Sequence, residues 1–378
     1  MTQPAAKVSP IPVNEPLVGE EERRYVDDCM ATGWISSEGG YVSRFEEAWA
    51  AYCGVQHGVA ISNGTTALFA AVAALRLQPG QEVILPSFTI IGCALAAIEA
   101  GLTPVLVDCD PRTWCMDLDQ VASRVGPRTG AVMAVHIYGH PVDGDALREL
   151  CAPRGLPVVE DAAEAHGATV RGRRTGSLGD IACFSFYANK IVTTGEGGMV
   201  VTDDPELAAR VRSYRNMAFR PERRFLHTEI GYNHRLTNVQ AAIGLGQVET
   251  IAPRVARKRE IGRRYTELLS GCRGISLPVE EPWAENVYWM YGLVLDEDTG
   301  HDAVSFASAL RKRGVDTRPF FLGMHEQPVL RERGLFAGET YPVTERIARQ
   351  GLYLPTGLTL TDEQIATVAY AVRDVLAA

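Results

Sequence analysis

The sequence predicts an α/β protein in which a large, mostly parallel sheet domain is followed by a smaller C-terminal α+β domain. Two observations favour this fold class. Between about residues 56 and 205, short apolar runs alternate with helical stripes, a pattern typical of parallel strands joined by crossover helices. After about residue 250, a charged amphipathic helix is followed by mixed strand-like and helical segments. We therefore expect a large domain at residues 1–250 and a small domain at residues 251–378, and 378 residues suffice for two or three units of roughly 150 residues each.

The individual elements follow from local patterns. In residues 64–77 apolar side chains recur every three or four positions, which predicts a helix that is capped by Ser62 or Asn63 and ends before Pro79. Most of the expected strands are apolar on both faces, as strands inside a sheet are. They are residues 83–85, 104–107, 131–136, 157–160, 181–186 and 199–202. Further helices are expected at residues 239–251, 254–269 and 361–376.

Composition excludes several classes of protein. The chain has 37 basic and 46 acidic residues, and a net charge of −9 has the wrong sign for binding nucleic-acid phosphates. The opening residues lack the apolar region of a secretory signal, and no apolar run is long enough to cross a membrane. Eight cysteines without a C-x-x-C pair suit buried thiols in a reducing compartment. We expect a cytoplasmic protein without disulfides.

Polar residues that follow strands are the first candidates for a site, because ligands of open α/β sheets bind beyond the carboxyl ends of the strands. The segment SNGTT at residues 62–66 opens a helix, where free N–H groups and hydroxyls can hold a phosphate or simply cap the helix. In EDAAEAH, residues 160–166, carboxylates end an apolar strand. Burial of an unpaired carboxylate is costly, so a cationic group is expected beside them.

Two later segments add an amine and further polar groups. Lys190 follows a strand and precedes the glycine-rich run GEGG. A lysine at such a sheet edge can have its pKa lowered by desolvation and then attack carbonyl groups, although many lysines after strands are only solvated. GYNHRLTN, residues 231–238, brings amide, imidazole and guanidinium groups to the start of a helix. An anion cradle, a carboxylate and a reactive amine together match the needs of pyridoxal phosphate.

Two other kinds of site are disfavoured. His136 and His140 are four residues apart, but Pro141 prevents the helix that would bring them together on one zinc ion. Gly244 and Gly246 lack the third glycine of a dinucleotide fingerprint and lie within a predicted helix. We therefore predict no metal site and no dinucleotide cofactor.

These segments also resemble a known family. ISNGTTAL, VILPSFTI, VVEDAAEAHGA, FSFYANKIVTTGEGGM and GYNHRLTNVQAAIG resemble motifs of the DegT/DnrJ/EryC1/StrS family of nucleotide-sugar aminotransferases, which depend on pyridoxal phosphate. The resemblance extends from residues 33–40 (GWISSEGG) to residues 317–328 (TRPFFLGMHEQP). It implies the fold type I of pyridoxal phosphate-dependent transferases and the alternation of pyridoxal and pyridoxamine phosphate as cofactor forms.

The resemblance also implies roles for individual residues. Lys190 would hold the cofactor aldehyde and move the proton, and Asp161 would pair with the pyridine nitrogen. Glu164 would lie near the cofactor's O3′ atom. Asn233 would reach the phosphate of the neighbouring subunit, which implies a homodimer with shared active sites. The phosphate ligands from the same chain would be Gly64, Thr65 and Ser185.

Ile90 departs from the family pattern, in which an aromatic residue often stacks on the cofactor ring. Van der Waals packing by Ile90 or a shift of Phe88 could replace that stacking. Motifs within the family imply L-glutamate as donor and GDP-4-keto-6-deoxy-mannose as acceptor. The nucleotide would be bound by residues in the matching motifs, namely Trp34, Ser36, Arg318, Phe320 and His325.

Three alternatives remain open at this point. The acceptor could carry UDP or dTDP, or the amino group could enter at C3. The chain could instead be a sugar dehydratase of the same fold, although such relatives typically have histidine at the position of Lys190. It could also be a regulatory relative that has lost catalysis, against which the intact Asp161, Ser185 and Lys190 argue.

Overall fold

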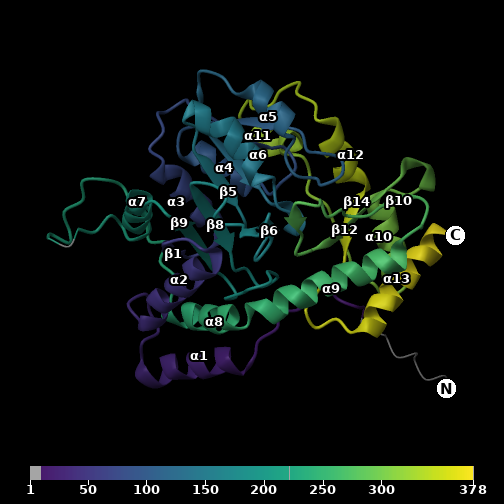
Figure 1. The fold of residues 1–378 in the computed structure, drawn as a ribbon, viewed down its shortest axis with the longest axis horizontal. Helices are drawn as coiled ribbons and strands as arrows, with labels where there is room; N and C mark the ends of the chain where they lie inside the picture. Colours follow the sequence, from purple (N-terminus) through teal and green to yellow (C-terminus); the bar gives the residue numbers. More distant parts are fainter. Residues whose placement is uncertain (1–9, 221, 378) are drawn as a thin grey trace.

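The structure is a computed structural model that describes residues 10–220 and 222–377. Its larger part is built on a sheet of seven strands in the order β1-β9-β8-β5-β4-β2-β3 (Figure 1). β9 runs antiparallel to both of its neighbours, and all other pairs in this sheet are parallel. The strands are β1 (His57–Ile61), β2 (Glu82–Pro86), β3 (Thr103–Val107), β4 (Thr129–Val135), β5 (Val158–Asp161), β8 (Ile181–Ser185) and β9 (Gly198–Thr202).

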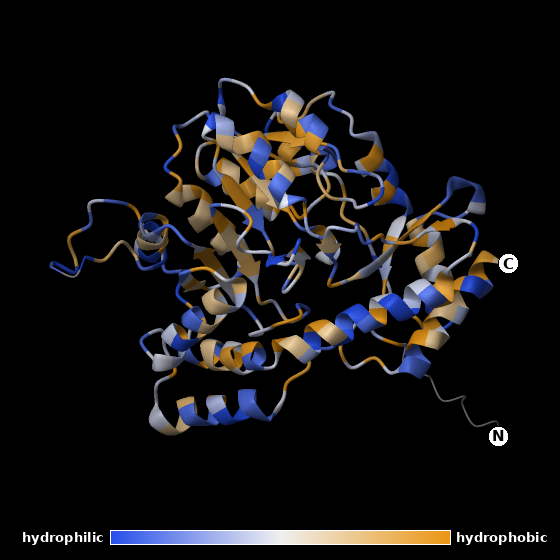
Figure 2. Ribbon diagram, viewed as in Figure 1, coloured by the Kyte–Doolittle hydropathy of each residue, from blue (hydrophilic) through white to orange (hydrophobic). Residues whose placement is uncertain are grey.

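Helices cover both faces of this sheet and enclose two apolar cores. One face packs against α3 (Gly64–Ala74), α4 (Gly92–Glu99), α6 (Gly144–Cys151) and α7 (Pro205–Arg215). The other face packs against α2 (Gly40–Cys53) and α8 (Asn238–Glu249), with α1 (Glu20–Thr32) outside α8. Figure 2 shows hydrophobic residues concentrated in the strands and hydrophilic residues along α1. The central strands are thus apolar on both faces because both faces are covered.

The six expected strands are all present, with ends that differ by one or two residues, and the α/β fold class is confirmed. β1 was not predicted, because His57 and Gly58 interrupt the apolar pattern at its start. The helix expected at residues 64–77 is α3, which ends at Ala74, three residues earlier than expected. Arg76 then has a left-handed backbone conformation with φ of 52°. Asn63 caps this helix by accepting a hydrogen bond from the Thr66 N–H.

A second sheet of four antiparallel strands lies in the C-terminal part, in the order β10-β12-β14-β13. It packs with α9, α10 and α13 around an apolar core of its own. In Figure 1, the long helix α9 extends from beside α8 to this smaller core. The elements are α9 (Ile251–Leu269), β10 (Ile275–Ser276), β12 (Tyr291–Leu295), α10 (Ala303–Lys312), β13 (Arg318–Pro319), β14 (Gly351–Leu354) and α13 (Asp362–Leu376).

α8 ends at Glu249 and α9 begins at Ile251, near the expected boundary at residue 250, and the division into two domains there stays a prediction. The first described residues, however, pair with the C-terminal part rather than with the large sheet. Ile11 donates its N–H to the Gly314 carbonyl and accepts from the Asp316 N–H, and Val13 accepts from Thr356. The remaining elements are α5 (Leu118–Arg124), β6 (Thr169–Val170), β7 (Arg173–Arg174), β11 (Ala284–Glu285), α11 (Pro328–Arg331) and α12 (Pro342–Gln350). Short 3₁₀ turns occur at Ile137–Gly139, Ala152–Arg154, Glu297–Thr299 and Met324–Glu326.

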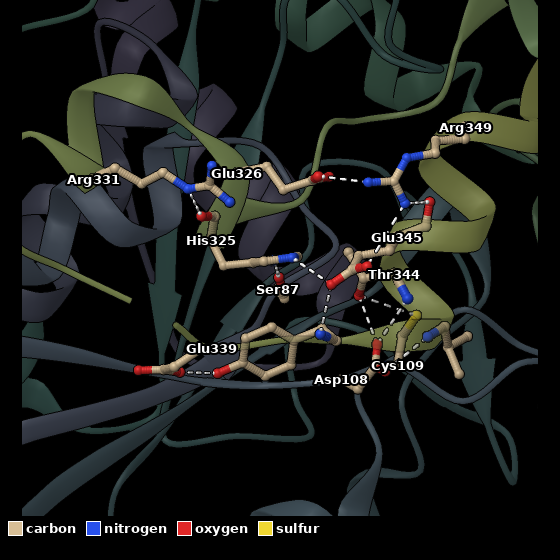
Figure 3. Close-up of polar contacts among 12 residues, drawn as sticks. Ser87, Asp108, Cys109, His325, Glu326, Arg331, Glu339, Thr344, Glu345 and Arg349 are labelled. Atoms are coloured by element: carbon tan, nitrogen blue, oxygen red, sulfur yellow. Dashed lines mark hydrogen bonds and ion pairs between the residues drawn. The ribbon is translucent and has the colours of Figure 1, made fainter. Parts of the chain in front are cut away.

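Polar contacts fasten the C-terminal part to the ends of β2 and β3 (Figure 3). Asp108, just after β3, accepts hydrogen bonds from the N–H groups of Val343 and Thr344 at 2.9 and 2.8 Å, and from the Thr344 hydroxyl at 2.7 Å. A carboxylate at this helix start satisfies N–H groups of α12 that have no partner within the helix. Ser87, just after β2, accepts from the Met324 N–H through its carbonyl at 2.8 Å.

Within residues 10–220 and 222–377, no helix has the length and apolar character needed to cross a bilayer. No group of three or more potential metal ligands gathers anywhere in the described chain. All eight cysteines are free thiols, seven of them buried. Residues 1–9, which begin the segment examined for a secretory signal, lie outside the described residues.

Glu160, next to the end of β5, is a buried carboxylate whose oxygens are all engaged. One oxygen accepts from the N–H groups of Leu178 and Gly179 at 2.7 and 2.6 Å. The other accepts from the Gly176 N–H at 2.8 Å and from His136 Nε2 at 2.9 Å. Because His136 Nδ1 accepts from the Val142 N–H, the Nε2 atom carries the proton. Glu160 therefore holds a loop and a neighbouring strand end in place beside Asp161.

We expect Glu160→Gln to lower the free energy of unfolding by about 3 kcal/mol, because an amide nitrogen cannot accept the hydrogen bonds that a carboxylate oxygen accepts. Urea denaturation of the variant measures this loss, and Glu149→Gln on the exposed face of α6 is the control. Equal midpoints for wild type and Glu160→Gln would show that Glu160 does not hold the loop.

Candidate active site

A cavity of about 290 Å³ opens where several parallel strands of the large sheet end. Val135, Asp161 and Ser185 are the last residues of β4, β5 and β8, and all three line it. Parallel strands bring their carboxyl ends to one edge of the sheet, so residues far apart in the sequence meet there. A more open groove of about 860 Å³ runs along α9 and is lined by arginine and glutamate side chains, but it contains none of the predicted site residues.

Lys190 lies in the turn after β8 and points its amine into the cavity. Its Nζ atom is 3.8 Å from a carboxylate oxygen of Glu164 and 3.6 Å from the centre of the Trp289 ring. Burial lowers the pKa of the Lys190 amine, and the charges of Glu164 and Asp161 act in the opposite direction. The amine therefore loses its proton more readily than an exposed lysine, which makes it a better nucleophile.

Asp161 is buried at the end of β5, and few hydrogen-bond donors contact its carboxylate. Its Oδ1 atom accepts from the Ala163 N–H at 3.1 Å, and its Oδ2 atom accepts from the Cys93 thiol at 3.1 Å. A thiol is a weak donor, and a carboxylate can accept about four hydrogen bonds. Asp161 can therefore still bind a cationic N–H group that enters the cavity. Cys93, in α4, was not predicted, since nothing in the sequence distinguishes it from the apolar residues around it.

Glu164 lies between Lys190 and the main chain of Tyr138. It accepts the Tyr138 N–H at 2.8 Å, and Tyr138 is held with a φ of 51°, a left-handed conformation that is rare for an aromatic residue. Burial raises the pKa of Glu164 to about 7, against the lowering effect of the Lys190 charge. The carboxyl group thus changes its charge near neutral pH, directly beside the amine.

The start of α3 and the end of β8 form a narrow cradle for an anion. A Cβ atom on Gly64 would lie 2.6 Å from the Ser185 Cβ, so only glycine allows this close approach. Thr65 lines the same corner, and the first N–H groups of the helix have no partners within the helix. These groups together can hold a phosphate.

Hydrophobic residues complete the wall of the cavity. Ile90 lines it and is half exposed, whereas Phe88 is buried against Phe320 and Tyr138 and does not line it. Sequence reasoning predicted a nucleotide site in the C-terminal part, but it missed the residues of that part that line the cavity, because they approach only through tertiary packing, although one of them follows Phe320 in the TRPFF motif. They are Trp289, Phe321 and Tyr353.

The other predicted site residues lie outside this cavity in the single chain. Asn233 is exposed and bridges to Asn216 in the segment that follows α7. Trp34 and Ser36 are exposed in the loop after α1. Arg318 is exposed in β13, where it pairs in register with Tyr353 of the cavity wall.

Phe320 and His325 are both buried. His325 lies between Ser87 and Glu345 (Figure 3), with Nδ1 2.8 Å from the Ser87 hydroxyl and Nε2 3.2 Å from the Glu345 carboxylate. Both of its ring nitrogens are thus occupied within the protein. Phe320 packs against Tyr138 and Trp114. Their direct contact with a nucleotide stays a prediction.

Comparison with known proteins places the chain in a family. The sequence model of the DegT/DnrJ/EryC1/StrS aminotransferase family matches residues 16–373. The chain belongs to this family. It is a nucleotide-sugar aminotransferase that depends on pyridoxal phosphate.

Individual relatives match over nearly their whole length. The chain is 42% identical to a GDP-perosamine synthase of Caulobacter vibrioides, over 97% of this chain and 98% of that protein. It is 36% identical to a GDP-perosamine synthase of Escherichia coli O157:H7, over 96% and 98%. Among solved structures, DesV of S. venezuelae in complex with a ketimine intermediate has a TM-score of 0.89 at 35% identity, covering 98% of this chain and 99% of that one.

The cavity residues fit pyridoxal phosphate by their chemistry. The cofactor needs an anion site, an acid for its ring nitrogen and an amine for its aldehyde. One cavity supplies all three groups. They are the cradle between Gly64 and Ser185, the Asp161 carboxylate, which can accept further hydrogen bonds, and the Lys190 amine. Each was predicted from a strand end, and the structure brings them together.

The raised pKa of Glu164 leads to a prediction about stability. The folded protein binds a proton that the unfolded chain releases between its ordinary pKa of 4.5 and about 7. This contribution to stability is fully present below pH 4.5 and is lost as the pH rises through about 7. We expect cofactor-free wild type to lose more stability than Glu164→Gln between about pH 5 and about pH 7.5, as measured by chemical denaturation. Parallel stability curves for the two proteins would contradict the raised pKa.

Proposed function

We propose that this aminotransferase moves the amino group of L-glutamate to C4 of GDP-4-keto-6-deoxy-mannose and so forms GDP-perosamine. The observation that carries the proposal is the 42% identity to a GDP-perosamine synthase along nearly the entire chain, combined with an intact lysine in the cavity. A lysine at residue 190 also favours transamination over dehydration, since an amine must be able to return the cofactor to its starting form.

Each cavity residue then has a task. Bound pyridoxal phosphate supplies an electron sink for the carbon that loses a proton. In the first half-reaction, the Lys190 amine would take that proton from Cα of glutamate. In the second half-reaction, it would give a proton to the sugar carbon that receives nitrogen. Asp161 keeps a proton on the ring nitrogen, and Glu164 exchanges protons beside the amine. Gly64, Thr65 and Ser185 hold the phosphate end, so that the reacting atoms stay aligned with Lys190.

The nucleotide end of the substrate would lie toward the C-terminal part. Arg318 is exposed and neighbours Tyr353 across paired strands, so its guanidinium is available at the side of the cavity. Guanidinium groups bind phosphates in a bidentate manner, which suits a diphosphate. Trp34 offers an exposed indole ring on which a base could stack.

A homodimer completes the proposed site. Figure 1 shows the segment after α7 projecting away from the body of the chain, and its Phe225 and Ile230 side chains are 82% and 80% exposed. Exposed apolar side chains of this size commonly mark a protein interface. A second copy of the chain would cover this arm. Asn233, which lies where the arm comes back to the body of the chain, would then reach the phosphate cradle of that second copy. The eight free thiols suit a reaction in the cytoplasm.

The first test is turnover. Wild type with pyridoxal phosphate and glutamate should aminate GDP-4-keto-6-deoxy-mannose with a kcat/KM at least about tenfold above that for UDP- or dTDP-linked ketoses. Lys190→Ala should lose at least about a thousandfold in turnover, because no other group can carry the proton. Product mass and linkage analysis report the outcome.

Preference for another nucleotide or for C3 would overturn the assigned substrate but leave the transaminase chemistry intact. Near-normal turnover by Lys190→Ala would overturn the chemistry itself. Lys312→Ala, on the exposed end of α10, is the matched control and should leave turnover unchanged.

The shared site is tested by mixing variants. Asn233→Asp places a negative charge against the partner's phosphate, so this variant and Lys190→Ala should each be nearly inactive alone. Unfolded together and refolded, they should recover about a quarter of wild-type activity, because hybrid dimers contain one intact site. Full activity of Asn233→Asp alone, or no recovery on mixing with Lys190→Ala, would show that the sites are not shared.

A further inference from the structure

Lys258 is a buried lysine for which the proposed mechanism has no task. It lies on α9 and is 1% exposed. Its Nζ atom donates to the main-chain carbonyls of Trp289 and Thr356 at 2.7 and 2.5 Å. No described residue offers it a carboxylate partner. Burial of an ammonium group without a counter-ion is costly, and a methionine could fill the same volume without that cost.

Trp289 connects this buried cation with the active site. Its carbonyl accepts from Lys258, and its indole Nε1 donates to the Asn189 carbonyl at 2.8 Å. The face of the same ring lies 3.6 Å from the Lys190 amine. Trp289 is therefore held at its main chain and at its side chain, and Lys258 provides the main-chain contact.

The turn that carries Lys190 is held from a second direction. The Asn189 carbonyl also accepts from the Asn14 side-chain amide at 2.8 Å. Two donors on one carbonyl restrain the peptide next to Lys190, so the long lysine side chain is the main mobile part at this point. Its free amine needs a defined place, because an unrestrained lysine samples many rotamers.

The charge of Lys190 also acts on the Lys258 amine. Desolvation lowers the pKa of Lys258 to about 7, and the charge of Lys190 contributes to this lowering. This effect agrees with the short path between the two amines through Trp289.

We propose that Lys258 is a positioning residue that fixes Trp289, so that the indole face becomes the resting place of the Lys190 amine whenever that amine is not bonded to the cofactor. An aromatic face attracts an ammonium group, and Glu164 at 3.8 Å holds it from another side. The amine then stays within reach of the atoms between which it moves a proton. The inference rests on the proposed function only in taking Lys190 as the reactive lysine.

The small number of lysines makes a direct test possible. The chain contains only Lys7, Lys190, Lys258 and Lys312. Biosynthetic labelling with [ε-¹³C]lysine gives four methylene signals, which single Lys→Met variants assign. In the cofactor-free protein, the Lys190 methylene protons should appear upfield of those of Lys312, because they lie over an aromatic ring.

Trp289→Leu should abolish this upfield shift, and Trp289→Phe should retain part of it. Lys258→Met should lose most of it although Trp289 is still present, whereas Lys312→Met should leave it unchanged. In the loaded enzyme, Lys258→Met should lower kcat about tenfold with little change in the KM for glutamate, because the amine is misplaced but substrate contacts remain.

Circular dichroism and melting curves show whether each variant is folded. If Lys258→Met does not fold, the Trp289 variants still decide whether the ring holds the amine, and Lys258→Gln decides whether a neutral side-chain donor at this position of α9 restores it. An unshifted Lys190 signal in wild type, or a shift unchanged in folded Lys258→Met, overturns this inference. Neither result affects the assigned transaminase, which only the turnover of Lys190→Ala tests.

Discussion

The site depends on one constraint, which is that an ammonium group and two carboxylates must be kept together in a cavity largely shielded from water. Lys190, Glu164 and Asp161 would each be unfavourable alone at this depth. Together they offset part of the desolvation, and the remaining imbalance appears as a lowered pKa of Lys190 and a raised pKa of Glu164. Glu164, whose pKa is raised to about 7, can therefore exchange a proton near neutral pH, beside an amine that burial makes easier to deprotonate.

The fold maintains this imbalance by closing the cavity from two sides. The strand ends supply the carboxylates and the cradle, and the C-terminal part supplies the wall that excludes water. The two are joined at the ends of β2 and β3, where Asp108 caps α12 and Ser87 meets His325 (Figure 3). A displacement of the C-terminal part would therefore also move the segment from Ser87 to Ile90, whose last two residues line the cavity. Docking of the two parts and the electrostatics of the site are coupled in this way.

Sequence reasoning predicted the strand-end residues because their signal is local. A capped helix after SNGTT, carboxylates after VV and a lysine before GEGG each stand out against their neighbours. Parallel pairing then places Asp161 and Ser185 at one edge without further information. Trp289 and Cys93 could not be found in this way, because Trp289 reaches the cavity only through the packing of the C-terminal part and Cys93 reaches Asp161 only through the packing of α4. The pairing of Ile11 with Val315 was missed for the same reason, since contacts over such sequence distances leave no periodic pattern.

The use of lysine at two buried positions follows from what arginine cannot do. The chain has 37 − 4 = 33 arginines, so lysine is the rare cation here. Arg254, which is also buried in α9, is paired with Glu22 at 2.8 Å, as a permanently charged group must be. Lys258, one helical turn later, has only carbonyl partners, and it can occupy that place because its pKa of about 7 lets it shed the charge that burial penalises. Lys190 needs the same freedom for a different purpose, since an amine that kept its proton could neither bond to an aldehyde nor carry a proton between carbons. The two positions thus share one requirement, a cation that can become neutral inside the protein.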